Sequence, residues 1–210
     1  MYIPKHNEET RVDVLHGLIH THPFAALVVP GADELSVTHI PFILDAADGE
    51  FGMLRAHVAR ANPVWQQLQG KSVAIFQGPH AYISPNWYPS KQEHHKVVPT
   101  WDYAVVHVHG HVRAIEDAEW LLNFVGRLSD VHEASQPKPW STAEAPRDYL
   151  DRLVERIVGI EMTIVRLEGK WKAHQRAPAA DKLGAIAGLN AIGTDATQGV
   201  AEMIAAARPK

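Results

Sequence analysis

Residues 76–106 read FQGPHAYISPNWYPSKQEHHKVVPTWDYAVV, and this stretch decides the fold because it joins two strand-like runs through one long loop. The loop carries aromatic, amide, hydroxyl, cationic and imidazole groups. Pro79, Pro85, Pro89 and Pro99 stiffen it, since each proline fixes its own φ and restricts the residue before it. Such a loop is typical of a site that stacks on a flat ligand and hydrogen-bonds its edges. The same aromatic residues would equally suit a packed connector, and composition alone leaves both interpretations open.

Strand-like segments continue outward from this stretch in both directions. We expect strands over residues 24–29, 35–44, 51–58, 71–76, 81–84, 101–115 and 160–167. Pro41 predicts a bulge or a sheet edge in the second of these. Helices are expected over residues 12–21, 63–68, 117–128 and 148–157, and again from residue 178 onward with a break at residues 193–195. Residues 133–146 resemble a linker.

This order of elements predicts the fold class. Six or seven short strands, punctuated by helices but not alternating with them one to one, favour an antiparallel barrel or sandwich with helical decoration. A doubly wound α/β fold would need regular βαβ units and usually a glycine-rich first turn, and the sequence has neither. We therefore predict a mainly β barrel with decorating helices.

Composition limits the function classes. The chain has 210 residues, 46% of them hydrophobic, which is enough for one domain with a full core. Its formal charge of −4 gives no global basic field for nucleic acid. The absence of cysteine excludes disulfides and thiolate chemistry, and it favours a cytoplasmic setting. The N-terminus has no apolar signal segment, and no uncharged run approaches the ~20 residues that would cross a bilayer.

A basic corner precedes the short helix at residue 63. Arg55 and His57 share one face of a predicted strand, and Arg60 and Asn62 follow at the start of the helix. Guanidinium groups beside free backbone N–H groups would make a phosphate cradle. The alternative is a solvated corner in which the arginines pair with acids such as Asp45.

Three histidines alternate with valines in the strand around residue 109. His107, His109 and His111 share one face, and neighbouring imidazoles on a strand lie roughly 7 Å apart, close enough to converge on a metal. No HExxH motif or acid at ligand spacing accompanies them, so we assign no metal and expect water, a subunit interface or a ligand beside them. Nucleophile-elbow, Walker and GxGxxG motifs are also absent, so no catalytic residue is assigned.

Several of these motifs together resemble one family. They are residues 1–6 (MYIPKH), 54–63 (LRAHVARANP), 76–88 (FQGPHAYISPNWY), 96–103 (KVVPTWDY) and 167–172 (LEGKWK). The pattern resembles the PaiB-type negative transcriptional regulators of the FMN-binding split-barrel group, over about residues 1–190.

The resemblance implies a six-stranded split barrel that forms a homodimer with FMN between the subunits. It places the FMN phosphate at the basic corner and the isoalloxazine near aromatic residues and hydrogen-bond donors. The implied cofactor-binding residues are Arg55, His57, Arg60, Asn62, Gln77, Ser84, Trp87, Tyr88, Lys96, Trp101, Lys170 and Trp171. It also implies a split-barrel domain over residues 1–175, on which a helical extension over residues 176–210 packs.

The implied function is that of a flavoprotein repressor. No helix-turn-helix is recognisable, so the sequence does not locate a DNA-binding surface. A flavin-dependent oxidoreductase is the first alternative, because related split barrels include redox enzymes. A haem-binding or haem-degrading split barrel is the second, since the chain has 14 histidines.

Overall fold

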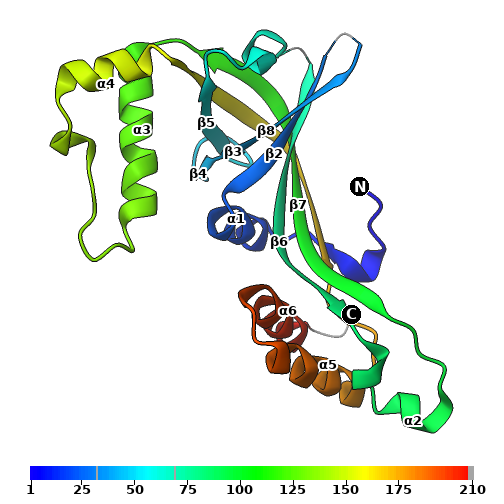
Figure 1. Cartoon of the computed structure of the whole chain (residues 1–210). Coiled ribbons are helices and arrows are strands. Elements are labelled where there is room, and N and C mark those ends of the chain that lie inside the picture. The colour runs from blue at the N-terminus through cyan, green and yellow to red at the C-terminus, as the bar shows by residue number, and fades with distance from the viewer. Residues whose placement is uncertain (32, 69, 208–210) are drawn as a thin grey trace. The chain divides into compact units, whose positions relative to one another are not determined.

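The computed structural model describes residues 1–31, 33–68 and 70–207, and the ribbon is shown in Figure 1. The strands of this part of the chain are β1 (Glu8–Glu9), β2 (Phe24–Pro30), β3 (Leu35–Pro41), β4 (Ile43–Asp45), β5 (Met53–Ala59), β6 (Lys71–Ile83), β7 (Thr100–Ile115) and β8 (Ile157–Lys172). Its α-helices are α1 (Val12–Thr21), α2 (Ser90–His94), α3 (Ala118–Glu133), α4 (Arg147–Val154), α5 (Ala179–Ile192) and α6 (Asp195–Ala206). Short 3-10 turns are η1 (Lys5–Asn7), η2 (Pro63–Gln66), η3 (Pro85–Trp87) and η4 (Thr142–Glu144).

The chain divides into two compact units. The first contains residues 1–18, 77–107 and 168–210, and the second contains residues 19–76 and 108–167. The long strands β6, β7 and β8 contribute residues to both units because each crosses a unit boundary.

The second unit is built on an antiparallel sheet. Its strand order is β3-β2-β6-β7-β8-β5-β4. Strand β3 therefore lies at an edge, as Pro41 predicted, because proline cannot donate to a ladder. Leu27, Leu54 and Phe76 are fully buried while their neighbours along the strand are less buried, so alternation along β2, β5 and β6 builds this core.

Helices pack in pairs inside each unit. In the second unit α3 lies beside α4 and contacts β5. In the first unit α5 and α6 lie side by side, as Figure 1 shows, and they bury Ala81 and Ile83 of β6 and Ala173, which follows β8. The predicted break between the two C-terminal helices is confirmed, since Gly193 ends α5 at φ +73° and Thr194 caps α6.

Several sequence-based boundaries were wrong. The expected strands over residues 71–76 and 81–84 form one strand, because Gly78 and Pro79 stay extended and Gly78 lets Leu18 and Ala104 approach closely. The strand expected over residues 35–44 is interrupted at Phe42, between β3 and β4. Finally, the helix expected to reach residue 157 ends at Val154, and β8 extends at both ends beyond residues 160–167.

Candidate functional site

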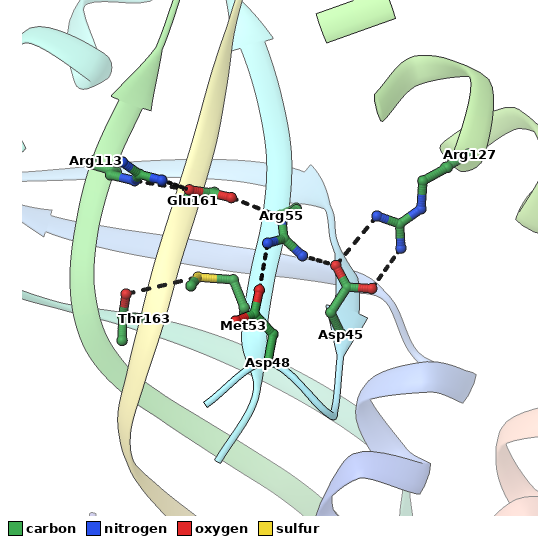
Figure 2. Close-up of polar contacts among 8 residues, drawn as sticks. All are labelled: Asp45, Asp48, Met53, Arg55, Arg113, Arg127, Glu161 and Thr163. Carbon is green, nitrogen blue, oxygen red and sulfur yellow. Dashed lines mark hydrogen bonds and ion pairs between the residues drawn. The ribbon is translucent and has the colours of Figure 1, made fainter. Parts of the chain in front are cut away.

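Arg55 of the predicted phosphate corner lies inside a cluster of acids in the second unit. The pairing of β5 with β8 places Arg55 opposite Glu161, and Nε donates to Glu161 Oε1 at 2.8 Å. Nη2 contacts Asp48 Oδ2 at 2.6 Å and Nη1 contacts Asp45, as Figure 2 shows. Three carboxylates thus surround one guanidinium. This is the arrangement of the alternative interpretation, in which the arginine pairs with acids.

The same network extends to both sides of Arg55. Arg113 of β7 contacts the second Glu161 oxygen, and Arg127 of α3 contacts Asp45 Oδ1 at 2.5 Å (Figure 2). Burial raises the pKa of Glu161, but hydrogen bonds from Arg55 and Arg113 and their positive charges outweigh burial and leave the pKa lowered. Glu161 is therefore a buried anion held between two arginines, which ties β5, β7 and β8 together.

His57 lies on the same face of β5 as Arg55, but its surroundings are apolar. Its ring meets Phe124 of α3 edge-on at 5.9 Å between centroids, and burial lowers the pKa of the imidazole. Nδ1 is buried and has no hydrogen-bond partner within the described residues. A buried ring nitrogen of this kind is available to a ligand.

Arg60 and Asn62 build the turn that follows β5. Arg60 binds Glu116 at 2.6 Å and the backbone oxygens of Glu155 and Ile157, so its donors are engaged. Asn62 accepts from Val64 N at 3.0 Å and donates to Thr38, with Pro63 at the first position of η2. The predicted asparagine cap is confirmed, although the helix is a four-residue 3-10 turn.

An aromatic face occupies one side of the sheet in the first unit. Trp101 is 54% exposed, stacks on His80 with centroids 6.2 Å apart, and meets Tyr82 edge-on at 6.3 Å. Burial alternates along β6 and β7, so these rings share the less buried side while Ala81 and Asp102 point the other way. Exposed rings in mutual contact offer a ready platform for a planar ligand.

Lys170 lies on this aromatic face. Its Nζ is 5.2 Å from the centre of the Tyr103 ring and 5.8 Å from that of Tyr2. Tyr103 is two residues beyond Trp101 on β7, and residues two apart share a face of a strand. Gln77 approaches His80 with 3.4 Å between Nε2 and Nδ1. Trp101, Lys170 and Gln77 of the predicted set therefore lie in the first unit with the aromatic face, which we define as Tyr2, His80, Tyr82, Trp101, Tyr103 and Lys170.

Trp87 and Tyr88 lie elsewhere in the first unit. Trp87 packs on α5, where Gly184 and Gly188 make room for it. Tyr88 is buried, and its hydroxyl lies 2.6 Å from His174 Nε2. Both residues belong to the core under α5 and α6.

The other three predicted residues of this unit have separate environments. Ser84 caps η3 by accepting from Asn86 N at 3.2 Å. Lys96 is exposed in the loop before β7. Trp171 lines a cavity of about 830 Å³ together with residues of the N-terminal segment and α6.

Sequence reasoning missed a buried polar chain in the first unit. His174 follows β8 with a left-handed φ of +53°, and its Nδ1 contacts the Asp102 carboxylate. The Tyr88 hydroxyl contacts the other ring nitrogen of His174 and completes the chain. Burial, together with the charges of Asp102 and Asp181, raises the pKa of Tyr88 to about 12. The signal for Asp102 was its place on the buried side of an alternating strand, directly after Trp101.

The histidine strand follows its predicted alternation. His107 and His109 are half-buried and His111 is exposed, while Val108 and Val112 are buried.

No helix in the described part of the chain has the length and apolar character needed to cross a membrane.

Comparison with known proteins places the chain in a family. A family model described as "Putative FMN-binding domain" matches residues 1–166. An uncharacterized protein of Emericella nidulans is 34% identical over 241 residues, covering 97% of this chain and 96% of the relative. The "Protease synthase and sporulation protein PAI 2" of Bacillus subtilis is 26% identical over 188 residues, covering 89% and 87%.

A solved structure supports the fold. The FAD and heme binding protein of Mycobacterium smegmatis superposes with a TM-score of 0.56 at 14% identity, over 79% of this chain and 73% of that chain. At this identity the likeness concerns the fold alone, and it confirms the predicted mainly β split barrel. The chain therefore belongs to the FMN-binding split-barrel family.

Proposed function

We propose that this protein binds FMN and acts as a homodimeric negative transcriptional regulator. The observation that carries the flavin part is the aromatic face, because it exposes stacked rings beside a cation. An isoalloxazine needs an aromatic or apolar surface and donors directed at its carbonyl oxygens and N5. Trp101 supplies such a surface, and Lys170 and Gln77 supply donors. FMN, when bound, would add a redox-active ring that the amino acids lack.

At the phosphate end of FMN, the arginines of the predicted corner already have partners. The family resemblance places the phosphate at Arg55, His57, Arg60 and Asn62. Both arginines are engaged by acids or carbonyl oxygens, so a phosphate there would have to displace them. Buried His57 Nδ1 has no hydrogen-bond partner among the described residues, so it is available to a ligand at this corner.

The regulatory part is supported by the resemblance to PaiB-type regulators and by the similarity to the Bacillus subtilis protein. DNA binding is expected to show as a shift of promoter fragments in a gel, and to weaken as salt rises because phosphate contacts release counterions. A chain that shifts no promoter fragment of its own genome, at any salt concentration, would remove this half of the proposal.

The flavin half is tested by an FMN titration of the purified protein, followed by flavin absorbance and fluorescence. Native protein should take up FMN, Trp101→Ala should weaken uptake by about tenfold, and Trp140→Ala should not change it, because stacking on one ring contributes roughly 1–3 kcal/mol. Trp140 is the matched control, since it is 40% exposed in the α3–α4 connection of the second unit. A protein that takes up no FMN contradicts the proposal.

A flavin-dependent oxidoreductase is the second candidate. The exposure of Trp101 favours it, because a ring stacked on an open surface stays within reach of another reactant. It predicts that FMN-loaded protein oxidises reduced nicotinamide catalytically when an electron acceptor such as dioxygen or a redox dye is supplied to reoxidise the flavin, whereas a pure regulator would not.

A further inference from the structure

A small pocket in the first unit lies between the end of β8, the start of β7 and the N-terminal turn η1. Its volume is about 180 Å³, and its lining includes His6, Thr100, Asp102, Lys172 and Arg176. At ~30 Å³ per water, this corresponds to about six water molecules. The pocket therefore fits a small ionic group and is too small for a flavin ring.

Lys172 gives this pocket a fixed positive charge. Its Nζ donates to Thr100 Oγ1 and to the Trp101 carbonyl oxygen at 2.6 Å, and both acceptors are neutral. Within the described residues no carboxylate forms an ion pair with Lys172, in contrast to Arg55 with its three acids. An ammonium has three donors, so one is left for a ligand while the other two hold the side chain in place.

The acid of the pocket is paired with a histidine. Asp102 is almost fully buried and pairs with His174 Nδ1, while Tyr88 holds the other ring nitrogen. Asp102 Oδ2 thus bonds to His174, and no ion pair between Asp102 and Lys172 is found among the described residues.

The wall after β8 is held rigidly. Gln175 Nε2 donates to the Trp171 carbonyl oxygen at 2.5 Å, and its Oε1 accepts from Ala173 N at 3.0 Å. Ala177 N closes the loop by donating to the His174 carbonyl oxygen at 3.0 Å. A binding wall that is fixed before the ligand arrives loses little entropy on binding.

A wider hollow adjoins this pocket. It has a volume of about 560 Å³ and shares His6 and Arg176 with the pocket, and Lys5, Glu8 and Thr10 complete its lining. Lys5 and Arg176 are exposed, and among the described residues neither forms an ion pair with an acid. A ligand could place an anionic head in the small pocket and its body in the wider hollow.

We propose that the small pocket binds the phosphomonoester of a small molecule, with Lys172 and Arg176 as its direct cationic contacts. A phosphomonoester carries a charge near −2 at neutral pH, which two cations match, and its oxygens can also accept from Thr100. The phosphate belongs either to FMN itself or to a separate phosphorylated ligand. The first form rests on the proposed function and moves the phosphate away from Arg55, whereas the second is independent of flavin.

The test is a titration of the full chain with inorganic phosphate in phosphate-free buffer, followed by calorimetry and phosphorus NMR. One phosphate should bind per chain, and Lys172→Met and Arg176→Gln should each weaken binding by about tenfold, as expected for a lost charge-assisted contact. Lys138→Met is the matched control, because it removes an exposed lysine from the α3–α4 connection and should change nothing. Arg176→Gln alters an exposed side chain, so it stays informative if Lys172→Met folds poorly.

Competition identifies the source of the phosphate. If FMN displaces inorganic phosphate and Arg176→Gln weakens FMN but not riboflavin, the pocket holds the phosphate of FMN. If FMN and phosphate bind together, a separate phosphorylated ligand is indicated. Phosphate that does not bind, or binds equally to native protein and both variants, overturns the inference even where FMN uptake is normal. Phosphate binding without FMN uptake would instead contradict only the proposed function.

Discussion

Glu161 is 3% exposed, and its carboxylate accepts hydrogen bonds from Arg55 and Arg113. Glu161→Gln would remove the negative charge of this side chain. Arg55 would then keep two acidic partners, Asp45 and Asp48. We expect a loss of about 2 kcal/mol in the free energy of unfolding at neutral pH, less than for a fully buried pair because Arg113 is solvated. Urea denaturation of the two proteins measures it.

The pH dependence of this effect has a definite sign. The pKa of Glu161 is lowered from its ordinary value of 4.5, so its contribution is present above that pH and disappears as pH falls through the lowered value. The difference between native protein and Glu161→Gln should thus be full at pH 7 and shrink in acid. Asp148→Asn is the control, because the Asp148–Arg152 pair is exposed and should contribute less than ~0.5 kcal/mol. An equal loss in both variants would refute the role given to burial.

Tyr88 gives a second prediction, in which stabilisation is lost as pH rises, whereas that of Glu161 is lost as pH falls. The pKa of Tyr88 is raised to about 12, first by burial and then by the charges of Asp102 and Asp181. For a group whose folded pKa is raised, the stabilisation is complete below the ordinary pKa and is lost as pH rises through the folded value. Tyr88→Phe should therefore cost about 1–2 kcal/mol at pH 8, through the lost hydrogen bond to His174, and progressively less in strong alkali.

Ultraviolet titration of the phenols checks the same assignment. The tyrosine that ionises last in native protein should be missing from Tyr88→Phe, whereas Tyr149→Phe should leave that late-ionising tyrosine in place. Tyr149 is a fair comparison because it is 49% exposed on α4. Identical late titration in native protein and Tyr88→Phe would show that the assignment is wrong.

At the scale of elements, α5 depends on glycines that face Trp87. A Cβ at Gly188 would overlap the Trp87 indole, whereas a Cβ at Gly126 of α3 has only Thr142 Oγ1 nearby, at 3.6 Å. Gly188→Ala should destabilise the protein by about 1–3 kcal/mol through overpacking. Gly126→Ala should stabilise it by up to ~1 kcal/mol, because alanine is the better helix former. Thermal denaturation of the two variants compares them, and a stabilised Gly188→Ala would mean that α5 does not pack on Trp87 as described.

The elements that sequence could predict are those with local signals. Asn62 before Pro63, and Gly193 before Thr194, mark helix ends through caps that involve neighbouring residues only. The break predicted at Gly78 was wrong because a strand can continue through Gly-Pro when its surroundings keep it extended. That information lies in Leu18 and Ala104, far from Gly78 in the sequence.

The residues of the candidate site also divide into those with a local signal in the sequence and those without one. Trp101 was predictable, because an aromatic residue on the exposed side of an alternating strand remains accessible. The surroundings of Arg55 were not, since Glu161 is 106 residues away and reaches it only through the register of β5 with β8. The sequence does not mark Lys172, because the neutral oxygens that its ammonium contacts belong to Thr100 and Trp101, which are 72 and 71 residues away.

At the scale of the whole molecule, the exposed aromatic residues of the first unit make self-association the next prediction. Tyr2, Tyr82 and Trp101 are 82%, 47% and 54% exposed, and exposed apolar groups gathered on one face mark interaction sites. If this aromatic face lies between two copies, as the proposed dimer requires, a charge placed there would be desolvated in the interface. Sedimentation equilibrium should then find dimers of the native chain and monomers of Trp101→Glu, with Trp140→Glu dimeric as the control. Because FMN would bind only the assembled face, added FMN should also raise the melting temperature of the native chain more than that of Trp101→Glu. A native chain that stays monomeric at tens of micromolar, with FMN bound, would separate the flavin site from any dimer and refute this arrangement.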